Sequence, residues 1–217
     1  RASHFTLPAS PSPIANRPMM DRWIISELHQ VIGNVDSALE NFDSQSAGKH
    51  LATFIDDLSN WYVRRSRRRF WDGDVMALET LYECLEKLTL LMSPMVPFIT
   101  EHVWQELIRP VHHDVVDSVH LADFPQVKSE LIDGELSSQV AQTRRLVELG
   151  RASRAESQVK IRQPLSRALI SAPGWMALDQ QLKDQIADEL NVLVLDDLAT
   201  TGGGLVDITI KANFRSL

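Results

Sequence analysis

Apolar residues recur at alternating spacings of four and three from Leu28 onward, and this periodicity constrains the fold more than any other feature. A series with these spacings falls on one face of an α-helix, so it predicts an amphipathic helix that begins near Met19. The expected buried residues of this first helix are Leu28, Ile32, Val35, Leu39 and Phe42.

Three more stretches with the same periodicity follow, and short segments rich in helix-breaking residues separate them. The second covers residues 46–71, the third follows Asp72-Gly73-Asp74, and the fourth begins at Pro97, which suits the first turn of a helix. Four such helices with short connections predict an antiparallel helical bundle. Their expected buried residues are Leu51, Phe54, Ile55, Leu58 and Tyr62, then Leu78, Leu81, Leu85, Leu88 and Met92, then Phe98, Val103, Trp104 and Leu107.

The second half of the chain predicts a small α+β subdomain. A long polar helix is expected over residues 133–157 and another helix over 177–190, with about three strands at 167–170, 192–195 and 205–210. The fold class is therefore mainly α. The predicted organisation is an extended lead-in at 1–18, a helical bundle at 19–128 and a truncated α+β subdomain at 129–217.

Composition excludes several classes of site. The single cysteine, Cys84, permits neither an internal disulfide nor a cysteine-cluster zinc site. His112-His113-Asp114 offers too few ligands for a metal, and no serine, histidine and aspartate set indicates a catalytic centre. No apolar run is long enough for a membrane span. Because the chain begins at Arg1 rather than methionine, we expect an excised piece.

The most informative segment is residues 59–71, in which five of the six positions from Arg64 to Arg69 are arginine. Like charges at helical spacing repel, so the cluster needs compensation by carboxylates or by an anionic ligand. With Leu58 at the centre of the buried face, a helical phase of 100° per residue turns Arg65 and Arg69 inward, where they are expected to form structural ion pairs. The outward set comprises Arg64, Arg67 and Arg68.

Two interpretations of the outward arginines stay open at this point. They could hold a nucleic-acid backbone, since guanidinium groups bind phosphate oxygens in a planar fork, with Trp61 or Trp71 as a flat surface nearby. Alternatively, the arginines form an ion-pair network with the surrounding acidic residues. The formal net charge of −7 favours an acidic protein partner over a polyanion. A phosphate backbone, however, is held by a local patch rather than by the net charge.

Several segments, taken in order, resemble the signatures of the anticodon-binding helical domain of class I aminoacyl-tRNA synthetases. Any one of them is weak, but the ordered set is specific and covers the chain from about residue 19 onward. The segments are Asp21-Arg22-Trp23-Ile24, residues 59–71, residues 93–104 from Ser93-Pro94-Met95 to Trp104, residues 119–125 from Val119-His120-Leu121 to Pro125, Lys160-Ile161-Arg162-Gln163-Pro164-Leu165, and Glu189-Leu190-Asn191.

The arginine-rich form of residues 60–69 resembles isoleucyl enzymes, whereas valyl enzymes carry an acidic residue soon after the Trp-Tyr pair. Residues 211–217 resemble a eukaryote-like isoleucyl branch, in which the chain continues. The resemblance implies a fragment of a cytoplasmic, ATP- and magnesium-dependent isoleucine–tRNA ligase. The His-Ile-Gly-His-type and Lys-Met-Ser-Lys-Ser-type motifs are missing, so the fragment is expected to be inactive alone and to need no cofactor.

The expected partners are tRNA(Ile) and the catalytic and editing domains of the parent chain. On this resemblance, Lys160 and Arg162 join Arg64, Arg67 and Arg68 as tRNA contacts, because alternate residues of an extended strand share a face. The alternatives are the same domain of a valyl or leucyl enzyme, and a helical protein–protein interaction module that meets an acidic partner.

Overall fold

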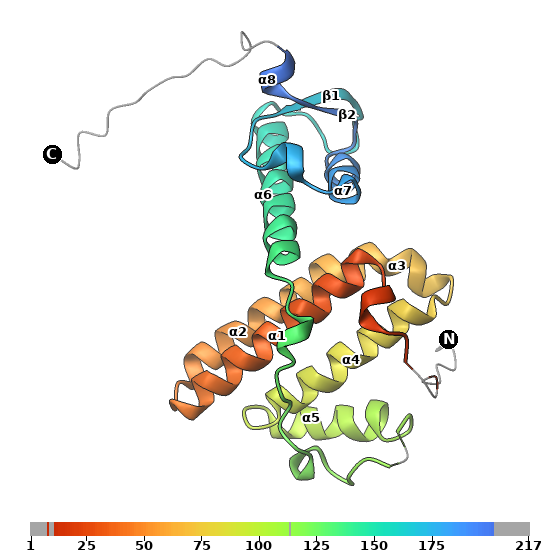
Figure 1. Cartoon of the computed structure of the whole chain (residues 1–217), viewed down its shortest axis with the longest axis vertical. Helices are drawn as coiled ribbons and strands as arrows, with labels where there is room; N and C mark the ends of the chain where they lie inside the picture. The colour runs from red at the N-terminus through yellow and green to blue at the C-terminus, as the bar shows by residue number, and fades with distance from the viewer. Residues whose placement is uncertain (1–7, 9–10, 113, 202–217) are drawn as a thin grey trace, which may run out of the picture. The chain divides into compact units, whose positions relative to one another are not determined.

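The computed structural model describes residues 8, 11–112 and 114–201 (Figure 1). The chain divides into two compact units, with the boundary between Ser137 and Ser138. The predicted boundary was residue 128, so the first unit extends further than the sequence indicated. Of the described helices, none combines the length and the apolar character that a bilayer crossing requires.

The first unit is helical, as the periodicity predicted (Figure 1). Helices α1 and α4 contact each other, and α2 packs along α1. Asp43 caps α2 by accepting a hydrogen bond from the backbone N–H of Ser46 at 2.9 Å. The elements are η1 (Ile14–Asn16), α1 (Met19–Glu40), α2 (Ser44–Asp56), the π-helical η2 (Asp57–Val63), α3 (Arg64–Trp71), α4 (Val75–Met92), α5 (Pro97–Val103), the π-helical η3 (Trp104–Ile108), and the 3-10 turns η4 (Val119–Leu121) and η5 (Ser129–Leu131).

The periodicity misplaced two aromatic residues. Phe42 is 96% exposed, because α1 ends at Glu40 and Phe42 takes a positive φ of 58°, so the helical phase no longer applies to it. Phe98 is 91% exposed, because α5 turns Thr100 and Trp104 inward instead. Phe98 lies two positions before Thr100, about 200° of helical rotation, which puts Phe98 on the opposite side.

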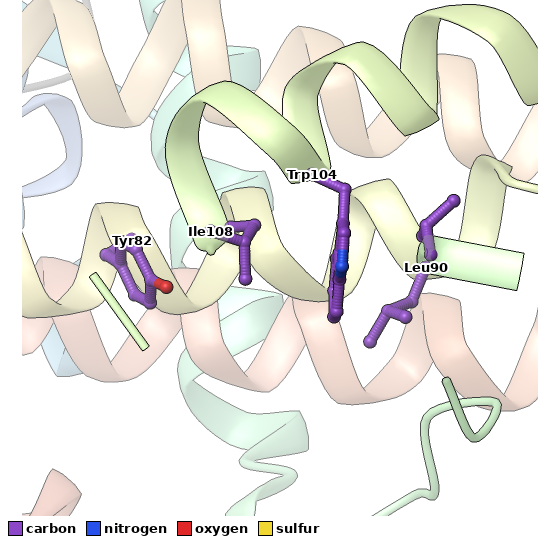
Figure 2. Packing of buried hydrophobic residues seen from close by; sticks show 5 residues of the cluster. Tyr82, Leu90, Trp104 and Ile108 are labelled. Carbon is purple, nitrogen blue, oxygen red and sulfur yellow. The ribbon is translucent and has the colours of Figure 1, made fainter. Parts of the chain in front are cut away.

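Helix α4 is buried on more than one face. The predicted positions Leu78, Leu81 and Leu85 are only half-buried, whereas Cys84 and Leu91 are inaccessible to solvent. The reason is that α4 packs on α1 and also on α5 and η3, so a single stripe cannot describe it. At its second interface, α4 contributes to a cluster of five buried residues: Tyr82, Leu90, Trp104, Ile108 and Val119. Figure 2 labels the first four of them.

The described part of the lead-in is folded onto α4. Arg17 is 5% exposed and donates to Thr80 Oγ1 at 2.9 Å and to Glu83 Oε2 at 3.3 Å. The backbone N–H of Ser12 donates to Glu79 Oε2 at 3.2 Å. The prediction of an extended segment was therefore incomplete, since composition does not reveal contacts to a helix more than 60 residues away.

The second unit contains a parallel pair of strands joined through a helix, which is an α+β arrangement as predicted. Leu165 pairs with Val192 and Ile170 with Asp197. The third predicted strand, at 205–210, lies outside the described residues. The elements are α6 (Gly134–Glu156), which begins just before the unit boundary, β1 (Leu165–Ile170), η6 (Trp175–Ala177), α7 (Gln180–Leu190), β2 (Val192–Asp197) and α8 (Leu198–Thr201).

Candidate nucleic-acid interface

The π-helical segment η2 sets the direction of the arginine-rich helix that follows it. Phe54, Leu58, Tyr62 and Ser66 are all buried, and each comes four residues after the last. On an ideal α-helix such a series drifts by about 40° per step, so it would leave the core. The wider i→i+5 turns of η2 absorb this drift. Ser66 therefore stays buried at 3% exposure and fixes which arginines of α3 face inward.

Arg69 is held in a network of ion pairs. Its Nη1 and Nη2 donate to the two carboxylate oxygens of Asp21 at 2.5 and 2.8 Å, and its Nε donates to Asp74 Oδ2 at 2.8 Å. These hydrogen bonds, first of all those to Asp21, raise the pKa of Arg69 above its ordinary value. Asp21 is fully buried, so the network ties α3 to the first turn of α1.

Two neighbours complete this network. The buried hydroxyl of Tyr62 donates to Asp21 Oδ1 at 3.0 Å, and burial followed by the charge of Asp21 raises the pKa of Tyr62. Asp74 accepts from Arg69 and also caps α4 through the backbone N–H of Ala77 at 3.2 Å. The hydrogen bond from Arg69 is the main cause that lowers the pKa of Asp74. One carboxylate thus joins the end of α3 to the start of α4.

Arg65 and Trp61 form a packed pair rather than part of an open surface. Trp61 is only 6% exposed, and the guanidinium carbon of Arg65 lies 4.9 Å from the centre of its ring. Such a cation–π contact is attractive. The expectation that Trp61 serves as a flat surface is corrected by this burial, because its ring belongs to the core that η2 turns inward. The expected ion pair of Arg65 stays a prediction.

Arg64, Arg67 and Arg68 are exposed, in the direction that the helical phase predicted. Arg64 Nε donates to the backbone carbonyl of Asn60 in the preceding η2, 3.2 Å away. Arg68 is 94% exposed and lies 3.7 Å from Asp72, a spacing and exposure at which an ion pair contributes little. Trp71, at the end of the same helix, is 84% exposed. The structure therefore presents three guanidinium groups and one indole ring to solvent on α3.

Lys160 and Arg162 are also exposed, but they do not lie in an extended strand. Residues 160–163 form a tight turn that is closed by a hydrogen bond from Gln163 N–H to Lys160 O at 3.0 Å. The argument that alternate strand residues share a face is therefore wrong for this pair. Strand β1 begins only at Leu165, because Pro164 cannot donate to a ladder.

Sequence reasoning missed the two residues that hold this turn. Arg154 of α6 is 6% exposed, and its Nη2 donates to the carbonyls of Lys160 at 2.8 Å, Ile161 at 3.4 Å and Gln163. Asn191, in the left-handed region at φ 50°, donates from Nδ2 to Ile161 O at 3.2 Å. A side chain that binds carbonyls leaves no periodic signal, so only the fold reveals it.

The family described as "Anticodon-binding domain of tRNA ligase" matches residues 21–169, a range that runs from α1 into β1. The chain belongs to this family. Within the anticodon-binding domain family, it is 59% identical to an isoleucine–tRNA ligase of Thermobifida fusca, and the alignment covers 99% of this chain. It is 58% identical to that of Streptomyces avermitilis over 96% of this chain, and 40% identical to that of Thermus thermophilus over 84%.

The chain spans only 20% of the length of the first two of these tRNA ligases. Family membership confirms the predicted anticodon-binding fold. The identities to isoleucine–tRNA ligases confirm the resemblance to isoleucyl enzymes. The expectation of a eukaryote-like branch finds no support, because the relatives named above are bacterial. The family match also covers the arginine-rich α3, which places this helix within the anticodon-binding domain.

Proposed function

We propose that this chain is the part of an isoleucine–tRNA ligase that holds tRNA(Ile) on its anticodon-stem side. One observation carries the proposal: on α3, Arg69 is tied to buried Asp21, while Arg64, Arg67 and Arg68 are exposed. A helix that anchors one arginine inward and presents three outward can bind phosphates without unfolding. The isoleucyl relatives support the choice of amino acid.

The contribution of the domain is to position the tRNA. Guanidinium groups hold phosphate oxygens in a planar fork, and Trp71 offers a ring on which an unpaired base can stack. In the parent, the catalytic domain would use ATP, magnesium and isoleucine in the cytoplasm. This chain would orient the tRNA so that its acceptor end reaches the catalytic and editing domains. The net charge of −7 disfavours long-range attraction to RNA, so binding rests on local contacts.

Salt-dependent tRNA binding tests the proposal. We expect the chain to bind a tRNA(Ile) transcript weakly at low salt, with an affinity that falls steeply as salt rises, because phosphate contacts release counterions. The triple variant Arg64→Ala/Arg67→Ala/Arg68→Ala should reduce the slope of log Kd against log salt by about 2–3. The matched control removes three exposed cations elsewhere, Lys49, Lys128 and Arg145, and should leave the slope nearly unchanged.

Two rival functions give different results. If α3 meets an acidic protein instead, tRNA will stay unbound while an acidic polypeptide binds with a dependence on the same arginines. If the parent is a valyl or leucyl enzyme, tRNA binding will persist but the cognate amino acid will differ. Aminoacylation by the full-length parent with isoleucine, valine and leucine decides between these enzymes.

A further inference from the structure

Three cations surround the turn at residues 160–163 in the second unit. Between Arg154 and Leu165 the basic residues are Arg154, Lys160 and Arg162, and the one acidic residue is Glu156. Lys160 and Arg162 are exposed, whereas Arg154 is 6% exposed beneath the turn. The turn therefore carries positive charge both on its surface and below it.

Arg154 is held by backbone dipoles instead of a counter-ion. In the described part of the chain, no carboxylate pairs with it, and its acceptors are the carbonyls of Lys160, Ile161 and Gln163. Its Nε and Nη1 are buried, and neither finds a hydrogen-bond partner among the described residues. Because no carboxylate compensates the charge of this buried guanidinium group, that charge would stabilise an anion at the turn.

The carbonyl contacts also fix the direction of the peptide groups. In a planar trans peptide the C=O and the following N–H point in opposite directions. Since the carbonyls of Lys160 and Ile161 face Arg154, the N–H groups of Ile161 and Arg162 face away from it. No acceptor for either N–H is found among the described residues. Two successive N–H groups in a turn form a concavity that binds anions.

We propose that the turn at residues 160–163 binds a phosphate group of tRNA, and that Arg154 is the positioning residue that holds the turn in its binding conformation. The backbone N–H groups of Ile161 and Arg162 contact the phosphate, and the side chains of Lys160 and Arg162 add charge. This inference rests on the proposed function, because the ligand is the same tRNA. It adds a second contact, in the second unit, that includes the backbone.

A mutant cycle on the 217-residue chain tests whether Arg154 acts through the turn. The variants are Arg154→Met, the double variant Lys160→Ala/Arg162→Ala, and the triple combination, each titrated with a tRNA(Ile) transcript. We expect the first two to weaken binding about tenfold each. The triple variant should weaken binding by less than the product of the two separate effects, because the turn that Arg154 holds carries the two cations as well as the backbone N–H groups. Arg145→Met, on an exposed arginine of the same helix, is the control and should leave Kd unchanged.

Backbone amide resonances give a readout that a merely structural role would not move. In the 15N-labelled chain, the amide protons of Ile161 and Arg162 should shift downfield when the tRNA(Ile) transcript is added. The shift should be absent in Arg154→Met, and Arg154→Lys should restore part of it, because an ammonium group can still reach some of the carbonyls. If Arg154→Met unfolds the second unit, the wild-type shifts still test the backbone contact.

Four outcomes would overturn the inference. The triple variant could lose the product of the two separate effects, in which case Arg154 acts independently of the turn. The two amides could stay unmoved at saturating tRNA, in which case the turn does not touch the phosphate. Binding could weaken in the α3 triple variant yet persist in all of the turn variants. This result would exclude the turn as a tRNA contact and leave the proposed function intact. A wild-type chain that does not bind tRNA would contradict both the turn contact and the proposed function.

Discussion

Arg69 binds Asp21 through both terminal nitrogens, at 2.5 and 2.8 Å, although 48 residues separate the two in sequence. Asp21 is fully buried, and the Arg69 side chain is 25% exposed. A buried carboxylate is costly unless it is paired, so Asp21 requires this arginine. The pair neutralises one positive charge on the inner face of α3. Arg64, Arg67 and Arg68 lie on the exposed outer face.

Replacing Arg69 with methionine should destabilise the first unit by about 3 kcal/mol, because Asp21 would stay buried without its counter-ion. Urea unfolding monitored by circular dichroism measures this change. Arg68→Met is the matched control, since Arg68 is 94% exposed, and it should change the unfolding free energy by less than about 0.5 kcal/mol. Equal effects of the two substitutions would contradict the assignment of Arg69 to the core network.

The two tryptophans that bracket the arginines should behave in opposite ways. Trp61→Ala removes a buried ring and should cost about 3–5 kcal/mol of unfolding free energy. Trp71→Ala changes an exposed ring, so stability should stay within about 0.5 kcal/mol while tRNA affinity falls. Thermal unfolding together with tRNA titration separates the two effects. A Trp71→Ala chain with unchanged tRNA affinity would exclude base stacking at this position.

His29 should make the stability of the first unit dependent on pH. It is 3% exposed, and its Nδ1 accepts from the backbone N–H of Lys128 at 3.2 Å. Burial, followed by the charge of Lys128, lowers its pKa below the ordinary value of 6.5. As pH falls, His29 is therefore protonated in the unfolded state before it is protonated in the folded state. The stabilisation from neutral His29 is complete above pH 6.5 and is lost as pH falls toward the lowered folded pKa.

Unfolding in urea at a series of pH values checks this prediction. In the His29→Asn variant, the unfolding free energy should no longer fall with pH just below 6.5. In His102→Asn, at an exposed position, this fall should persist. A slope that survives in His29→Asn would assign the pH dependence to another group.

Two glycines should respond oppositely to alanine. A Cβ on Gly150 of α6 would come within 2.5 Å of Leu190 Cδ1 and 3.1 Å of its Cγ, and Leu190 is 4% exposed. Gly150→Ala should therefore cost about 1–3 kcal/mol, because a buried leucine has little room to move. Gly48→Ala in α2 meets nothing within 4 Å and should stabilise by about 0.5–1 kcal/mol. Thermal unfolding of both variants tests the close packing at Gly150; a neutral Gly150→Ala would refute it.

In the full-length parent, the exposed arginines of α3 should affect only the tRNA-dependent step. The triple variant Arg64→Ala/Arg67→Ala/Arg68→Ala should retain isoleucine-dependent pyrophosphate exchange but transfer isoleucine to tRNA more slowly. The reason is that a small error in the position of the tRNA lowers the transfer rate strongly. The 217-residue chain alone should show no exchange. Parallel assays of exchange and aminoacylation check this, and equal loss of both steps would mean that α3 supports the catalytic domain rather than the tRNA.

The sequence by itself determined the helices of the first unit, the α+β character of the second and the family. Hydrophobic periodicity is a local property, and capping residues such as Asp43 act within three or four positions, so both can be recognised without the fold. The exposure of Arg64, Arg67 and Arg68 also follows from local phase, because Leu58 lies only about two to three turns away.

Only the tertiary structure decided which aromatic ring is available and what holds each basic segment. Trp61 and Trp71 are equally plausible as surface residues in the sequence, but the π-helical turns of η2 rotate Trp61 into the core. Asp21, the buried partner of Arg69, and Thr80, a partner of Arg17, each lie more than 45 residues away in sequence. Arg154 binds backbone carbonyls, which every residue type has, so the sequence does not mark its partners. Long-range pairing and backbone contacts leave no periodic trace, so they emerge only when the chain is folded.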